Sequence, residues 1–96
     1  MNITFESGKI TNINKGTQEA FTILDASTTN PIGKALIETY PEGERIRTQW
    51  YISANSINSG RPVQGSAINE EHAKEIIQEK FNQANRASKI FKNFKL

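Results

Sequence analysis

Apolar and polar side chains alternate near the start of the chain, which is the pattern of half-buried β-strands. Ile3 and Phe5 are flanked by polar residues, Ser7-Gly8 offers a turn, and the alternation resumes over residues 9–13. Two short strands joined by a small flexible turn form a hairpin. The sequence therefore predicts a β-hairpin over residues 3–13.

Two further strand-like runs follow, and turn-forming residues end each of them. Residues 20–25 are rich in the β-branched and aromatic side chains that favour strands. Residues 34–40 form the next run, for which a short helix is the alternative. Asn-Pro within residues 27–31 and Pro-Glu-Gly-Glu over residues 41–44 are typical of tight turns. Short runs separated by such turns favour an antiparallel sheet.

The clearest strand pattern in the chain covers residues 45–53. Successive side chains of a strand point to opposite faces, so this segment has two faces of different character. One face carries Ile46, Thr48, Trp50 and Ile52, and the other carries Arg45, Arg47, Gln49, Tyr51 and Ser53. We expect the first face to be buried and the second to face solvent.

Residues 54–67 show no periodicity and are predicted to form a loop, of a length that is often functional in a small domain. A helix is expected to begin directly afterwards, with Asn69 as its N-cap. Ile68 and Ala73 are spaced to form a hydrophobic staple around that cap. Two glutamates in the first turn complement the positive end of the helix dipole.

Apolar residues recur with helical spacing through the rest of the chain. One face of the predicted helix holds Ala73, Ile76, Ile77, Ala84, Ala87, Phe91 and Phe94, with Phe81 at its margin and Lys80 inside the stripe. A helix of about 25 residues spans roughly 37 Å. A chain of 96 residues folds into a domain of roughly 32 Å in diameter. The helix is therefore expected either to kink around residues 82–88 or to project from the domain.

Length and composition suit one small domain with a modest core, since 35% of the 96 residues are hydrophobic and 23% are charged. The chain has no cysteine, which excludes disulfides and thiolate metal sites. It has no apolar run long enough for a membrane span and no signal-peptide pattern, so we expect a cytoplasmic protein. Abundant Asn, Ile and Lys indicate an AT-rich coding sequence, as in low-GC bacteria and their phages and plasmids.

The sequence carries no pattern typical of an enzyme. His72 is the only histidine, whereas a zinc site needs three or four ligands. As a general base His72 would need an oriented partner and a nucleophile, and Ser59 and Ser66 lie in no nucleophile-elbow sequence. We therefore predict a non-enzymatic protein without a metal ion or another cofactor, in which His72 is an exposed side chain of the first helical turn.

The polar face of the strand over residues 45–53 is one candidate binding surface. Arg45, Arg47 and Tyr51 lie on it, and such side chains contact phosphates and stack on a base or an aromatic ring. The alternative is an ordinary solvent-facing strand, in which Glu38 or Glu44 neutralises the arginines across the sheet.

The basic end of the predicted helix is the other candidate binding surface. After Glu79 the chain contains no acidic residue. The helix dipole explains cations only in the last turn, and the expected i−4 acidic partners are missing. With Arg61 of the predicted loop, the cations proposed to bind an anionic partner are Arg86, Lys89, Lys92 and Lys95.

The same end of the helix is also apolar. If it projects, it exposes a patch that suits a partner or a second copy of the chain. The residues of this patch are Ile90, Phe91, Phe94 and Leu96.

Strands first and a helix last favour an α+β domain, in which an antiparallel β-meander of four or five strands is packed by a long C-terminal α-helix. We expect one domain over residues 1–96, with a strand-rich part at 1–53, a loop at 54–67 and a helix at 69–94.

The function expected is that of a small non-enzymatic binding module that occupies a nucleic-acid or nucleoprotein surface. One concrete form is a mobile-element inhibitor of the anti-CRISPR or anti-restriction type. An acidic protein surface is a further possible partner, and no membrane is involved. The alternative is a structural protein that forms oligomers, such as a homodimer, through the apolar end of its helix.

Overall fold

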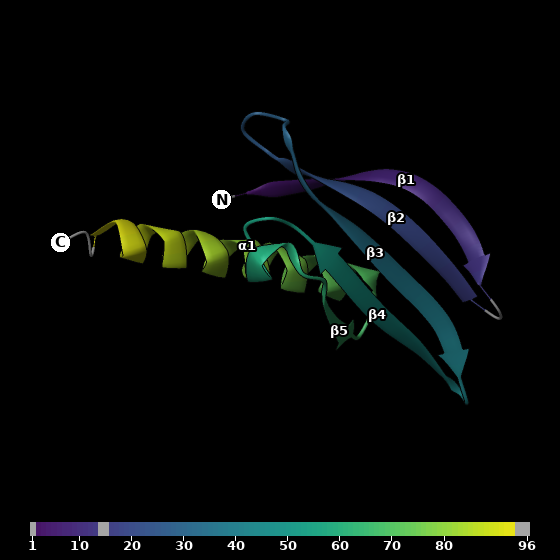
Figure 1. Cartoon of the computed structure of the whole chain (residues 1–96). Helices are drawn as coiled ribbons and strands as arrows, with labels where there is room; N and C mark the ends of the chain where they lie inside the picture. The colour runs from purple at the N-terminus through teal and green to yellow at the C-terminus, as the bar shows by residue number, and fades with distance from the viewer. Residues whose placement is uncertain (1, 14–15, 94–96) are drawn as a thin grey trace.

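The computed structural model describes the backbone of residues 2–13 and 16–93, and side chains up to residue 85. It has an α+β fold, in which one helix packs on an antiparallel sheet (Figure 1). The strands are β1 (Ile3–Ile13), β2 (Gly16–Asp25), β3 (Pro31–Glu42), β4 (Arg45–Ser53) and β5 (Val63–Ala67), and the helix is α1 (Glu70–Asn93). The strands lie in chain order within one sheet, so the predicted meander is confirmed.

β1 is one continuous strand, although the sequence predicted a hairpin there. Ser7 pairs with Phe21 and Ile10 pairs with Glu19, so three steps along β1 match two steps along β2. The extra residue forms a β-bulge, which bends the strand and increases its twist. Ser7-Gly8 therefore bends the strand without reversing it, and the hairpin prediction is wrong.

The core lies between α1 and one face of the sheet. The sheet contributes Ile3, Phe21, Ile23, Ala35, Ile37, Trp50 and Ile52 to it. From the helix, Ala73, Ile77 and Phe81 are buried and follow one another at intervals of four residues, which places them on one line along α1. Phe81 is only 2% exposed, so it lies at the centre of the buried face and not at its margin as predicted.

Asn69 caps α1 as expected, but the predicted staple is absent. The backbone N–H of His72 donates to Asn69 Oδ1 at 2.8 Å, and the backbone N–H of Ile68 donates to His72 Nδ1 at 3.0 Å. The side chain of Ile68 is 78% exposed, so it packs against nothing at the start of the helix. These two hydrogen bonds, one to Asn69 and one to the ring of His72, fix the helix start in place of a hydrophobic contact.

α1 is one uninterrupted helix of 24 residues, and its C-terminal part extends away from the sheet (Figure 1). The molecule is accordingly elongated, with a longest dimension of 55 Å. Of the two expectations for this helix, projection holds and the kink does not. Within the described residues the helix is not apolar enough to cross a membrane.

The part of the chain predicted to be a loop, residues 54–67, contains the fifth strand. β5 is short, and its inward-facing residues Val63, Gly65 and Ala67 are too small to give a recognisable hydrophobic pattern. A tight turn over Asn58–Gly60 precedes it, and each of its three residues has a positive φ angle. This left-handed turn carries the chain from the end of β4 back to pair with it.

Ile46 is the one residue of the predicted buried face of β4 that is not buried. It is 73% exposed, whereas Thr48 on the same face is 1% exposed. Ile46 pairs with Pro41 next to the turn between β3 and β4. Figure 1 shows that α1 does not extend over this end of the sheet, so alternation along the strand does not lead to burial there.

A first prediction compares Ile77 and Ile46, two isoleucines that the sequence pattern placed on apolar faces. Ile77→Ala removes a fully buried side chain from a small core and should lower the free energy of unfolding by about 2–4 kcal/mol. Ile46→Ala, at the exposed position, should change it by less than about 0.5 kcal/mol. Chemical denaturation measures both values. Equal losses would contradict the placement of Ile46 outside the core.

A second prediction concerns Gly65, which pairs with Trp50. A Cβ atom at residue 65 would come within 2.6 Å of the indole ring, which is buried and 4% exposed. Gly65→Ala should therefore destabilise the protein by about 1–3 kcal/mol through overpacking. Ser66→Ala, next to it on the opposite face of β5, is the matched control and should be nearly neutral. A neutral Gly65→Ala in denaturant titrations would show that the indole moves freely.

A third prediction follows from the turn between β2 and β3. Asp25 Oδ1 accepts hydrogen bonds from the hydroxyl of Ser27 at 2.7 Å and from its backbone N–H at 2.9 Å. These bonds favour the carboxylate and hold the pKa of Asp25 below its ordinary value of 3.8. A lowered pKa in the folded state contributes stability above the unfolded pKa, and this contribution is lost as the pH falls through the folded pKa.

Asp25→Asn should therefore reduce the loss of stability between about pH 5 and pH 2. Thermal melts at a series of pH values would measure this, with the exposed Glu44→Gln as the control. If the two variants lose stability in parallel with the unmodified protein, the Ser27 bonds do not favour the carboxylate.

Candidate binding face of the sheet

One face of the sheet is left uncovered by α1, and we call it the outer face. On β4 the side chains of Thr48, Trp50 and Ile52 are buried on the helix side, so those between them point the other way. Strand register then defines the outer face across the central strands. Its residues are Gln18, Ala20, Thr22, Lys34, Leu36, Glu38, Tyr40, Glu42, Arg45, Arg47, Gln49, Tyr51, Ser53, Gln64 and Ser66.

The outer face brings Tyr40 beside the predicted arginines. Tyr40 of β3 pairs with Arg47 of β4, two residues along each strand from the pair formed by Glu42 and Arg45. The sequence analysis did not include Tyr40 in a site. Alternation within residues 34–40 was the available signal, because it separates Leu36, Glu38 and Tyr40 from the buried Ala35 and Ile37.

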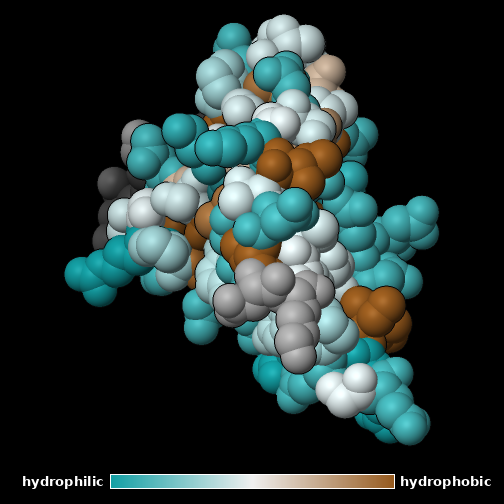
Figure 2. All heavy atoms as spheres, turned by 90° about the vertical axis from the view of Figure 1, so that its right-hand side faces the viewer, coloured by the Kyte–Doolittle hydropathy of each residue, from teal (hydrophilic) through white to brown (hydrophobic). Residues whose placement is uncertain are grey.

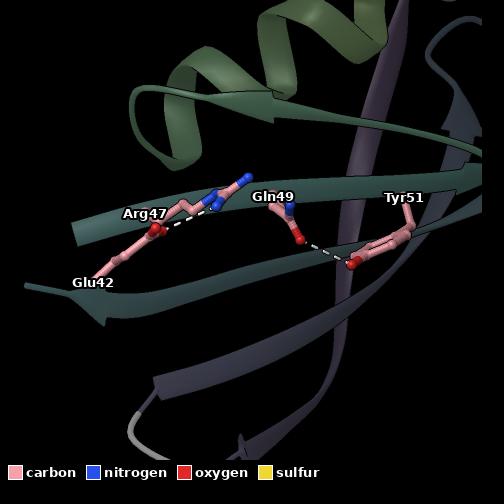
Figure 3. A network of polar contacts seen from close by, with 4 residues as sticks. All are labelled: Glu42, Arg47, Gln49 and Tyr51. Atoms are coloured by element: carbon pink, nitrogen blue, oxygen red, sulfur yellow. Dashed lines mark hydrogen bonds and ion pairs between the residues drawn. The ribbon is translucent and has the colours of Figure 1, made fainter. Parts of the chain in front are cut away.

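Arg47 forms an ion pair, but not with either of the expected glutamates. Its guanidinium lies 3.0 Å from Glu42 Oε2 (Figure 3). The hydrogen bond to Glu42 raises the pKa of Arg47 above its ordinary value. Glu38 instead accepts a hydrogen bond of 2.9 Å from Gln18 Nε2. Both partners of the ion pair are about half exposed, so solvent screens it and a competing anion can replace Glu42.

Tyr51 lies along β4 with its hydroxyl directed toward Gln49. The hydroxyl donates to Gln49 Oε1 at 3.1 Å (Figure 3). Burial of the half-buried ring raises the pKa of Tyr51, and the nearby Glu38 and Tyr40 raise it further. The ring is therefore held against the sheet, across from Leu36, its partner on β3.

Arg61 lies beyond the other end of β4. It follows the left-handed turn, which approaches β4 through a contact of 3.4 Å from Ser53 Oγ to the carbonyl of Gly60. Arg45 and Ser53 are the two end residues of β4, roughly 26 Å apart at the usual rise per residue. The structure thus places Arg45, Arg47 and Tyr40 at one end of the outer face and Tyr51 near the other. The predicted residues do not form one cluster.

Two hollows lie at these two ends. The first, of about 350 Å³, is lined by Glu42, Arg45, Ile46, Arg47 and Ala67. The second, of about 270 Å³, is lined by Leu36, Tyr51 and Pro62 with Lys34 and Ser53, together with Ala35 and Ile52, and its walls are apolar. The outer face therefore offers a charged end and an apolar end.

Hydrophobic surface is scattered elsewhere. Figure 2 shows the side of the molecule that lies to the right in Figure 1, which is mostly hydrophilic with separate small hydrophobic patches. Among the described residues, the exposed large hydrophobic side chains are Ile10, Leu36, Ile46 and Ile68. Leu36 is the one of these four that lines the apolar hollow.

The basic and apolar ends of the helix remain predictions. The side chains of Arg86, Lys89, Lys92, Lys95, Ile90, Phe91, Phe94 and Leu96 lie outside the described residues.

His72 takes part in the hydrogen bonds that cap α1. It is half-buried, where the sequence predicted an exposed side chain. Residues 2–13 and 16–85 hold no group of three or more His, Asp or Glu side chains placed to bind a metal ion.

Comparison of the chain with protein-family models, with curated proteins and with solved structures found no match.

Proposed function

We propose that the protein is a non-enzymatic binding module, which acts by occupying a nucleic-acid or nucleoprotein surface with its outer face. The observation that carries the proposal is the group of Arg45, Arg47 and Tyr40 at the uncovered end of β3 and β4. Arginines beside an aromatic ring suit phosphates together with the face of a base. A rigid sheet holds these side chains at fixed spacing without help from a loop.

The ion pair of Arg47 with Glu42 favours the binding of an anion at one defined position over a general attraction of anions. It reduces the attraction of this end for phosphates at long range, while an anion held at the right position can still displace the exposed carboxylate. A mobile-element inhibitor of the anti-CRISPR or anti-restriction type is one concrete form of this function. Such a protein needs only to cover a surface that its target uses, and it needs no chemistry of its own.

A fourth prediction tests the charge at this end by the salt dependence of binding to a labelled oligonucleotide. If Arg45 and Arg47 contact phosphates, a plot of log K against log salt should have a slope of about −1.8 for duplex DNA and about −1.4 for a single strand. Arg45→Gln and Arg47→Gln should each make the slope shallower by slightly less than about 1.

Two glutamates provide a matched pair of variants for the same measurement. Glu42→Gln frees Arg47 and should raise the affinity a few-fold more than Glu44→Gln, which changes the net charge equally but breaks no ion pair. Equal effects would show that only net charge matters. If no oligonucleotide binds at low salt, naked nucleic acid is excluded. A pull-down from the native host, with and without nuclease, would then test the nucleoprotein alternative.

A further inference from the structure

The apolar hollow near the end of β4 is built differently from the arginine end. Leu36 and Tyr51 are cross-strand partners that form its floor on the outer face, and Pro62 closes one side. Tyr51 is fixed by its bond to Gln49, and Pro62 follows a turn in which three successive residues have positive φ angles. A turn of this kind costs energy at its non-glycine residues and persists only where the surrounding structure holds it.

The hollow is of a size that suits one side chain. Its volume of about 270 Å³ is below the roughly 300–1,000 Å³ usual for small-molecule sites. Interfaces between proteins, in contrast, commonly place one apolar or aromatic side chain in a pocket, with polar residues around it. Gln49, Gln64 and Ser53 are polar neighbours of this kind on the outer face.

Two cations adjoin the hollow, and the carboxylate of Glu38 lies near Tyr51. Lys34 contributes to its wall and Arg61 directly precedes Pro62, and both are exposed. Neither has an ion-pair partner among the described residues, in contrast to Arg47. The acidic residues of the central outer face, Glu38 and Glu42, are engaged by Gln18 and Arg47. A partner segment with a carboxylate beside its apolar residue would complement this end.

We infer that this hollow binds a protein segment that inserts one apolar side chain next to an acidic residue. The inference rests on the proposed function. It narrows the partner to a nucleoprotein, whose protein component occupies this hollow. The arginine end then contacts the nucleic acid of the same complex. Apolar walls give no hydrogen bonds to the edge of a base, which favours a side chain over a nucleotide here.

A random heptapeptide library displayed on phage provides the probe, selected against the full chain. The peptides that are enriched should share one Leu, Ile, Met or Phe beside Asp or Glu. Fluorescently labelled synthetic copies should lose affinity by about tenfold or more on Leu36→Lys, the size of effect expected for an anchoring contact. Ile10→Lys makes a comparable change at an exposed isoleucine that lines neither hollow and should leave the affinity within about twofold.

Lys34→Glu is the second variant. It changes the charge at the hollow and leaves the apolar side chains of Leu36, Tyr51 and Pro62 in place. It should remove the preference, so that the enriched peptides no longer carry Asp or Glu beside the apolar residue. Circular dichroism of each variant confirms that it is folded. Absence of a consensus, or a consensus that persists on both variants, would overturn the inference.

The arginine variants keep this result separate from the proposed function. If Arg45→Gln and Arg47→Gln weaken oligonucleotide binding while Leu36→Lys and Lys34→Glu leave peptide selection unchanged, the inference fails and the proposed function stands. If a labelled oligothymidylate competes with the peptide and Leu36→Lys weakens its binding, the hollow takes a base, which also overturns the inference. Peptide binding that depends on the hollow, without any oligonucleotide binding, supports the inference and removes naked nucleic acid as the partner.

Discussion

The packing of α1 on one side of the sheet determines what the rest of the molecule can do. A sheet has two faces, and a chain of this length supplies one helix to cover them. Trp50, Ile52, Ile77 and Phe81 are buried on the covered side. An antiparallel sheet tolerates solvent on its other face, so the fold itself requires no aromatic or apolar residue there. Tyr40, Tyr51 and Leu36 on the outer face are therefore accessible to a partner.

The polar contacts of the outer face limit how such binding can work. Its arginine end is partly neutralised by Glu42, and Glu38 in its middle is held by Gln18. A face of this kind attracts anions less at long range than an unpaired row of cations, because long-range steering depends on the summed charge. Short-range fit then contributes more of the specificity, and the apolar hollow supplies a feature that a charge alone does not.

Local signals in the sequence were sufficient for much of this architecture. The alternation in residues 45–53 correctly separated Arg47, Gln49 and Tyr51 from Trp50 and Ile52, because side chains of a regular strand must alternate. The cap at Asn69 was also predictable, since it depends on residues within one helical turn. Neither feature requires knowledge of what lies across the sheet.

The features that were missed depend on contacts distant in sequence. Ser7-Gly8 suits a turn as well as a bulge, and only pairing with β2 distinguishes the two. In the sequence Gly65 is typical of a loop, and only its pairing with Trp50 shows that it belongs to a strand. Ile46 follows the strand pattern but lies where the helix does not reach. Tyr40 joins the candidate site only through its register with Arg47, which a sequence pattern does not specify.

The sheet holds the two ends of the outer face at a fixed spacing. Arg47 and Tyr51 stand four residues apart on β4, which corresponds to roughly 13 Å, and both have neighbours on β3. Neither end alone is large: one is an exposed ion pair beside a tyrosine and the other a hollow for one side chain. Because the sheet fixes their spacing before binding, little conformational entropy is lost when both are occupied. A partner that presents an anion and an apolar residue at the matching distance gains from both contacts, whereas one that presents either alone gains only one. The sheet would thus obtain its selectivity from the spacing of two modest contacts, without the deep cleft that a chain of this size does not form.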